Sequence, residues 1–155
     1  MKQKTYSMRA RCMALAGIVF VSALQAWAGL VEPVNRSRQG VAAKGYDVVA
    51  YFKQSQPVMG SVQYATSWMG ANWWFSSAEN RDSFKAHPEQ YAPQFGGYCA
   101  WAVSNGYTAE IDPEAWKIID GKLYLNYSKD VQRKWAQDVE KRIADANRNW
   151  PGLHK

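Results

Sequence analysis

The sequence predicts an α+β domain built from two antiparallel β-hairpins, a short central helix and a long C-terminal helix. Two segments, 62–75 and 115–127, carry apolar and β-prone residues on either side of a glycine-containing turn, which is typical of hairpins. Residues 128–150 instead place apolar side chains at helical spacing. Hairpins that are each followed by a helix indicate an α+β architecture rather than alternating βαβ units.

The central helix begins at a capping box. Ser76-Ser77-Ala78-Glu79 places a hydroxyl before the helix and a glutamate that can reach back to the first amide. We expect this helix to run to about Ala86 and to bury Ala78 and Phe84. Pro88 ends it, because a proline pushes the residue before it out of the helical region.

The segments around the hairpins are predicted from their glycines and apolar residues. The dense apolar block 45–52 is expected to be a strand or a tight turn. Gly96-Gly97 is expected to be a flexible joint before a short helix within residues 98–105, which Gly106 ends. Asp120-Gly121 is the strongest hairpin-turn signal in the chain.

The C-terminal helix is expected to be long, beginning at the capping residue Ser128 and running to about Trp150. Pro151 then ends it. Its apolar positions at helical spacing are Val131, Trp135, Val139, Ile143 and Ala146. No internal repeat is evident in the sequence.

The first 28 residues have the pattern of a secretory signal peptide. Four basic residues precede the apolar run from Met13 to Ala28, which closes on Ala26-Trp27-Ala28. This run falls short of the ~20 residues that a spanning helix needs. We therefore expect cleavage after Ala28, a periplasmic or secreted protein without a stable membrane anchor, an extended lead-in over 29–43 and a folded domain over 44–151.

Removal of the leader changes the charge and the cysteine count. The whole chain has 19 basic and 13 acidic residues, for a net charge of +6. The leader holds four of the basic residues and Cys12, so the mature chain carries +2 and one thiol, Cys99. A near-balanced charge without a basic stripe argues against nucleic-acid binding. Phosphate-binding glycine loops, HExxH and a Ser-His-Asp set are also absent from the sequence, which argues against hydrolase and nucleotide-dependent activity.

Several motifs, in order, resemble those of the secreted branch of YHS-domain proteins. The resemblance covers nearly all of the mature chain and implies the fold of that family, whose wider group is a metal-associated module. Cysteine-bearing members place thiols at two positions that are Ser76 and Asn80 here, so the resemblance implies no metal site there. The motifs are Gly45-Tyr46-Asp47, Val49-Ala50-Tyr51-Phe52, Trp74-Phe75-Ser76-Ser77, Asn80-Arg81, Phe84, Pro88, Tyr91, Gly96-Gly97-Tyr98-Cys99-Ala100, 121–127 and Trp150-Pro151.

Cys99 is the first candidate for chemistry, since a lone thiol is unusual in an oxidising compartment. Its apolar neighbourhood favours a buried structural cysteine. The two preceding glycines and the short helix that follows indicate instead a place where a ligand can approach. The candidate ligand-binding residues are Tyr98, Cys99 and Trp101.

A soft metal site is the second candidate. Cys99 and His87 are ligand types that suit copper, and Met59 or Met69 are candidates for a third ligand. His87 has the alternative of a structural role at the end of its helix. His154, next to the C-terminus, is expected to belong to a frayed tail.

From these patterns we expect a non-enzymatic, secreted binding module for a metal ion, copper above all, or for a small ligand. Two alternatives stay open. One is a thiol-dependent redox protein that uses Cys99. The other is a protein-interaction accessory with an aromatic contact face, drawn from Trp68, Trp73, Trp74, Trp101, Trp116, Trp135 and Trp150; in a small domain, such rings more commonly fill the core.

Overall fold

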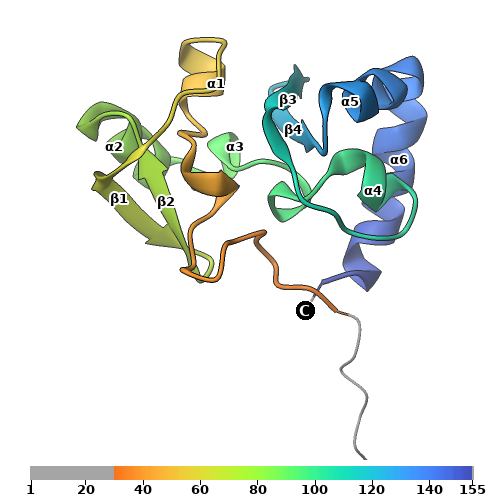
Figure 1. Cartoon of the computed structure of the whole chain (residues 1–155), viewed down its shortest axis with the longest axis horizontal. Coiled ribbons are helices and arrows are strands. Elements are labelled where there is room, and N and C mark those ends of the chain that lie inside the picture. Colours follow the sequence, from red (N-terminus) through yellow and green to blue (C-terminus); the bar gives the residue numbers. More distant parts are fainter. Residues whose placement is uncertain (1–29, 155) are drawn as a thin grey trace, which may run out of the picture.

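Two antiparallel hairpins, each followed by a helix, organise the computed structural model, which describes residues 30–154 (Figure 1). The first hairpin pairs β1 (Ser61–Trp68) with β2 (Ala71–Phe75), and the second pairs β3 (Asp112–Ile119) with β4 (Lys122–Asn126). The two sheets lie in separate halves of the molecule, with the lead-in segment crossing beneath both. The predicted α+β fold with two hairpins is confirmed.

The helices begin and end close to where the sequence predicts. Ser77 and Ser128 cap the helices that follow the hairpins, each accepting a hydrogen bond from the amide three residues ahead. Glu79 does not reach back to the first turn but pairs with Lys53 at 2.8 Å, and Ala78 is exposed. The described helices are α1 (Ala50–Lys53), α2 (Ala78–Ala86), α3 (Pro88–Tyr91), α4 (Ala100–Ser104), α5 (Lys129–Trp135) and α6 (Val139–Asn149).

The two hairpin–helix units repeat one backbone design at a spacing of 51 residues, although no repeat is evident in the sequence. β3 and β4 begin and end 51 residues after β1 and β2. Both hairpins shift register near the start of their first strand. Their turns match as well: Met69-Gly70 has φ values of 48° and 71°, and Asp120-Gly121 has 50° and 70°.

The repeat extends upstream of the hairpins, at a spacing of 52 residues. Residues 43–45 have φ values of 48°, 53° and 81°, and residues 95–97 have 56°, 60° and 80°. Each of these left-handed turns leads into a short helix, α1 or α4. The block 45–52, predicted as a strand or tight turn, is therefore a turn followed by α1. We call residues 43–86 the first copy and residues 95–135 the second copy.

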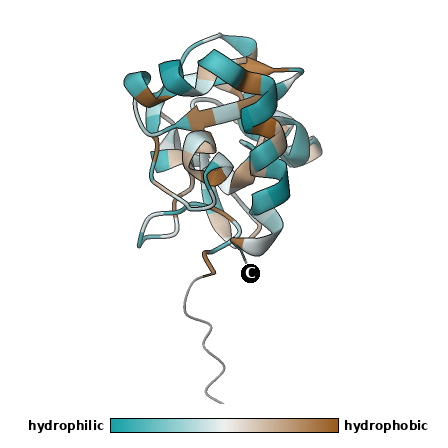
Figure 2. Ribbon diagram, turned by 90° about the vertical axis from the view of Figure 1, so that its right-hand side faces the viewer, coloured by the Kyte–Doolittle hydropathy of each residue, from teal (hydrophilic) through white to brown (hydrophobic). Residues whose placement is uncertain are grey.

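Two apolar clusters form the core. One includes Phe75 and Phe84 of the first copy, with ring centroids 5.1 Å apart, and reaches Cys99, Ile111 and Leu125 of the second. The other includes Tyr124 and Trp135, whose rings lie 5.3 Å apart. Phe84 and Trp135 are equivalent in the two copies, and both are fully buried. In Figure 2 much of the helical ribbon on the side facing the viewer is coloured as hydrophilic.

The C-terminal helix is interrupted, unlike the single helix that the spacing predicts. A 3-10 segment, Ala136–Asp138, separates α5 from α6, and Asp138 has φ −151° and ψ 64°, outside the helical region. Val131 of α5 packs on the first cluster, whereas Trp135 of α5 and Ile143 of α6 both belong to the second. A straight helix is therefore replaced by two helices that follow both parts of the core.

Parts of the sequence-based prediction fall outside this description. The predicted signal peptide, residues 1–28, lies outside the described residues. Within residues 30–154, no helix is long and apolar enough to cross a membrane. The lead-in is tied to the second copy where the Asn35 amide donates to the Gly96 carbonyl at 2.8 Å.

His154 is held firmly, so the expectation of a frayed tail is wrong. Its ring stacks on Trp150 with centroids 4.3 Å apart and planes 13° apart. Its Nδ1 lies 2.8 Å from Trp150 O. The Val31 amide donates to Leu153 O at 2.9 Å, which fixes the backbone next to the histidine. His154 also borders a cavity of about 130 Å³, together with Met69 and the lead-in.

Candidate functional site

In the first copy, a buried carboxylate occupies the junction between the short helix and the hairpin. Asp47 is fully buried, and its Oδ1 accepts from the amides of Val49 and Ala50 at 2.9 and 3.2 Å. Its Oδ2 accepts from the Ser76 amide at 2.8 Å, from the Ser76 hydroxyl at 2.6 Å and from Asn80 Nδ2 at 2.7 Å. Five donors thus satisfy this carboxylate, which meets the requirement for burying a charge.

In the second copy, Cys99 takes the place of Asp47. The Cys99 amide donates to Ala109 O at 3.0 Å, as the Asp47 amide donates to Val58 O at 2.8 Å. The Tyr127 amide donates to Cys99 Sγ at 3.3 Å, as the Ser76 amide donates to the carboxylate. The amides two and three residues after the cysteine, those of Trp101 and Ala102, also act on the sulfur. The backbone donors that hold a carboxylate in one copy therefore surround a thiol in the other.

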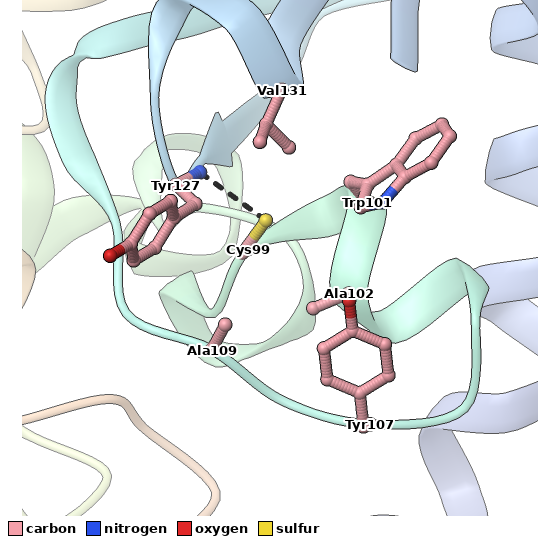
Figure 3. Close-up of a pocket in the computed structure, with 7 residues that line it drawn as sticks. All are labelled: Cys99, Trp101, Ala102, Tyr107, Ala109, Tyr127 and Val131. Carbon is pink, nitrogen blue, oxygen red and sulfur yellow. Dashed lines mark hydrogen bonds between the residues drawn. The ribbon is translucent and has the colours of Figure 1, made fainter. Parts of the chain in front are cut away.

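The side chains that cover Asp47 have no polar counterparts around Cys99. Tyr127 stands where Ser76 stands in the first copy, and it is 59% exposed. Val131 stands at the position of Asn80 and offers only methyl groups. An open pocket of about 260 Å³ results, with the thiol at its base (Figure 3). Its lining residues are Cys99, Trp101, Ala102, Tyr107, Ala109, Tyr127 and Val131.

The thiol itself is held in its neutral form. Cys99 is 1% exposed, and burial raises the pKa of the thiol; the amides of Ala102, Tyr127 and Trp101 act in the opposite direction without overcoming it. A free cysteine has a pKa of about 8.5. Cys99 is therefore protonated at neutral pH.

A buried side-chain amide, that of Asn126, also lies beside the thiol. Asn126 is fully buried, and its Oδ1 accepts from the Trp101 amide at 3.2 Å and lies 3.8 Å from Cys99 Sγ. Asn126 Nδ2 has no hydrogen-bond partner among the described residues. The equivalent residue of the first copy is Phe75, so the second copy has a more polar interior beside its thiol.

Residues 49–95 match the family model of the YHS domain. The chain contains a YHS domain. No curated protein and no solved structure matches the chain. The YHS domain match spans most of the first copy and ends at Phe95, so Cys99 and its pocket lie beyond it.

Inside the YHS domain, Ser76 and Asn80 have a structural task. These are the positions that carry thiols in cysteine-bearing relatives, according to the resemblance described above. Here both side chains donate to the buried Asp47 carboxylate. Their polar groups are therefore already used within the domain.

Of the three predicted ligand-binding residues, two line the pocket and the third does not. Cys99 and Trp101 both line the pocket, and Arg142 lies over the Trp101 ring, 4.0 Å from its centroid. Tyr98 lies outside the pocket lining and packs against Trp150, with ring centroids 5.9 Å apart. Tyr98 is therefore part of the apolar packing of the second cluster.

The predicted metal ligands line separate cavities. His87, at the end of α2 within the YHS domain, is exposed and borders a surface cavity with Pro88 and Glu89, whereas Cys99 borders the pocket described above. Neither Met59 nor Met69 lines the Cys99 pocket. Among residues 30–154, no group of three or more His, Cys, Asp or Glu side chains is placed to hold a metal ion.

The aromatic contact face receives no support from the exposed residues. Every tryptophan of the described chain is buried or half-buried. The exposed large apolar residues are Leu30, Met59, Val62, Met69, Tyr107 and Tyr127.

Sequence reasoning missed the residues that form the wall of the pocket, Tyr107, Tyr127 and Val131, together with the buried Asn126 beside it. One signal for them exists in the chain. The pairs Gly45-Tyr46 and Gly97-Tyr98 recur at a spacing of 52 residues. The loop before the second hairpin is one residue shorter, so the spacing falls to 51 and Tyr127 and Val131 correspond to Ser76 and Asn80.

Proposed function

We propose that this YHS-domain protein is a non-enzymatic binding module, exported by its predicted signal peptide, that takes a small and mainly apolar ligand into the Cys99 pocket. One observation carries the proposal. The same backbone framework is filled by the Ser76 and Asn80 side chains in the first copy but is left open in the second.

The pocket has the size and lining of a small-ligand site. Its volume of about 260 Å³ lies just below the ~300 Å³ at which typical ligand cavities begin. Three aromatic residues and Val131 supply apolar wall, and no charged side chain lines it. A neutral molecule of about the size of one aromatic ring system fits this chemistry better than an ion does.

Catalysis by the thiol has weaker support. A nucleophilic cysteine needs an adjacent base or a lowered pKa. None of the seven residues that line the pocket is a histidine, carboxylate or lysine, and burial raises the pKa of Cys99.

The test uses indole and phenol as neutral probes. We expect each to cause saturable chemical-shift changes at the amides of Cys99, Tyr107 and Tyr127 in the full chain. Val131→Phe fills the pocket and is expected to abolish these changes. Val62→Phe makes the same substitution at an exposed position of β1 and is expected to leave them intact. Shifts that do not saturate, or that persist in Val131→Phe, would refute the proposal.

A second candidate is a thiol redox function of Cys99, favoured by the ring of amides that holds a carboxylate in the first copy. Such donors favour an anionic sulfur. In the proposed step, the thiolate attacks one oxygen of a hydroperoxide, the S–O bond forms as the O–O bond breaks, and the leaving alkoxide takes up a proton. Sulfur is oxidised to a sulfenic acid and the hydroperoxide is reduced to an alcohol.

Mass spectrometry after treatment with hydrogen peroxide separates the two functions. Addition of oxygen to Cys99 in the folded protein, absent in Cys99→Ser, supports the redox function. Oxidation that occurs only after unfolding in urea supports the binding module.

A further inference from the structure

A positive charge lies directly behind one of the residues that line the Cys99 pocket. Arg142 belongs to α6, and its Cζ lies 4.0 Å from the centroid of the Trp101 ring. Trp101 lines the pocket, whereas Arg142 does not (Figure 3). The lining itself carries no charged side chain. The guanidinium therefore acts on the pocket through its field rather than by contact with a ligand.

Trp101 and Arg142 are fixed relative to each other by hydrogen bonds. The Trp101 amide donates to Asn126 Oδ1 at 3.2 Å, and its carbonyl accepts from Ser104 Oγ and Asn105 Nδ2, each at 2.7 Å. Arg142 Nη1 in turn donates to Asn105 Oδ1 at 3.4 Å. The cation and the indole thus belong to one connected network that joins α4 to α6.

No carboxylate neutralises Arg142 within the described part of the chain. None of the ion pairs formed by residues 30–154 includes it, and its Nε is buried without a hydrogen-bond partner among those residues. Arg148 on the same helix differs, because it is 71% exposed and pairs with Asp145. Solvent screens exposed and paired charges strongly and a half-buried, unpaired charge much less. Arg142 is half-buried, so its field extends into the pocket.

The aromatic lining alone would favour a cationic ligand. Trp101, Tyr107 and Tyr127 surround the pocket, and clusters of aromatic rings bind ammonium groups through their electron-rich faces. Arg142 opposes this preference, because its guanidinium already occupies the Trp101 ring and repels a second positive charge nearby.

We infer that Arg142 is a specificity-determining residue that excludes cationic amines from the Cys99 pocket. The inference rests on the proposed function and narrows its ligand to neutral aromatic molecules without a protonated amine. Its test does not require that such a ligand binds, because the thiol at the base of the pocket reports the local field.

Two methanethiosulfonate reagents of similar size serve as probes, one with a trimethylammonium group and one with a sulfonate. In each reaction the Cys99 thiolate attacks the sulfenyl sulfur, an S–S bond forms and methanesulfinate leaves. Rates are measured on the full chain at one pH, and peptide mass spectrometry separates Cys99 from Cys12. Each rate is divided by that of the urea-unfolded chain. Since both reagents meet the same thiolate fraction, the ratio of the normalised rates depends on the field alone. We expect the anionic reagent to be favoured at least about tenfold.

Three variants assign this preference to Arg142. Arg142→Met keeps the length of the side chain without its charge, and is expected to bring the ratio within about twofold of one. Arg142→Lys keeps a positive charge and is expected to retain most of the preference. Arg148→Met is the matched control, because it removes a charge from the same helix at an exposed, paired position, and is expected to leave the ratio unchanged.

Three results would overturn the inference. One is a ratio near one in the unmodified protein, a result that does not depend on how the variants fold. Another is an equal change in Arg142→Met and Arg148→Met, with circular dichroism showing that both are folded. The last is failure of both reagents to reach Cys99 in the folded protein, which would also refute the proposed function. If indole and phenol do not bind but the ratio depends on Arg142, only the proposed function fails.

Discussion

Cys99 Sγ lies in the second copy where the Asp47 carboxylate lies in the first. Each accepts a hydrogen bond from the backbone amide just after the second strand of its hairpin, that of Tyr127 or Ser76. The carboxylate additionally binds Asn80, whereas the thiol faces an open pocket. The two copies therefore share backbone hydrogen bonds. They differ because the Asn80 side chain covers the acceptor in the first copy, whereas the second copy has a cavity there.

Asp47→Ala is expected to destabilise the protein by about 3 kcal/mol or more. The substitution leaves buried amides and the Asn80 side chain without an acceptor, and each unsatisfied buried group costs about 1–3 kcal/mol. Urea unfolding of the full chain measures the change. Asp130→Ala removes an exposed carboxylate and is expected to change stability by less than about 1 kcal/mol. Equal effects of the two substitutions would contradict the role assigned to Asp47.

We expect the second copy to hold a buried carboxylate, as the first does, when Cys99 and Val131 are both replaced by the residues found at the equivalent positions of the first copy. Cys99→Asp alone is expected to destabilise the fold, because the new carboxylate lacks the side-chain donors that Ser76 and Asn80 supply in the first copy. Adding Val131→Asn supplies the counterpart of Asn80. A double-mutant cycle is expected to give a favourable coupling of about 1–3 kcal/mol. A coupling near zero would show that the two copies are not equivalent at this position.

The pH dependence of Cys99 alkylation follows from its burial. Because burial raises the pKa of the thiol, the thiolate fraction at pH 7 is smaller than that of a free cysteine, whose pKa is about 8.5. Reaction with iodoacetamide is therefore expected to be slow at neutral pH and to accelerate as the pH rises above that ordinary value. The rate is followed by mass spectrometry, with urea-unfolded protein as the control. A midpoint below pH 7 in the folded protein would instead favour the redox function.

The sequence predicts the local elements well, because their signals are local. The Asp120-Gly121 turn, the caps Ser77 and Ser128 and the end of α2 before Pro88 all depend on neighbouring residues. The same information places Cys99 and Trp101 near a short helix, where the pocket is found.

The repeat and the grouping of site residues were not predictable in the same way. Equivalent positions carry different chemistry, as in Asp47 and Cys99 or Asn80 and Val131, so the copies share backbone hydrogen bonds rather than residue types. His154 lines a cavity with residues of the lead-in, whose Val31 amide donates to the Leu153 carbonyl. Such contacts join residues far apart in the chain, so the spacing of apolar residues along the sequence cannot predict them.

The caps give a test of whether both copies fold by the same local rules. Ser77→Ala and Ser128→Ala each remove an acceptor for the amide three residues ahead, and each is expected to cost about 1 kcal/mol. The matched variants Ser77→Thr and Ser128→Thr retain the acceptor and are expected to lower the free energy of unfolding by only a few tenths of a kcal/mol, on the order of 0.3 kcal/mol. If alanine and threonine had the same effect at either position, the cap there would contribute nothing to stability.

Two glycines with similar torsion angles are expected to respond very differently to alanine. Gly96 has φ +60°, and a Cβ there would lie 2.0 Å from Pro33 O, a backbone atom that cannot move without displacing the lead-in. Gly121 has φ +70°, but a Cβ there meets nothing within 4 Å. Gly121→Ala is therefore expected to cost only the left-handed strain of about 1–2 kcal/mol.

Gly96→Ala adds a steric clash to that strain, so we expect a loss of more than about 3 kcal/mol or failure to fold. Thermal unfolding compares the two variants. Similar stabilities would mean that the lead-in does not pack against Gly96. A large loss confined to Gly96→Ala would show that the lead-in, which also borders the cavity of Met69 and His154, is an integral part of the fold.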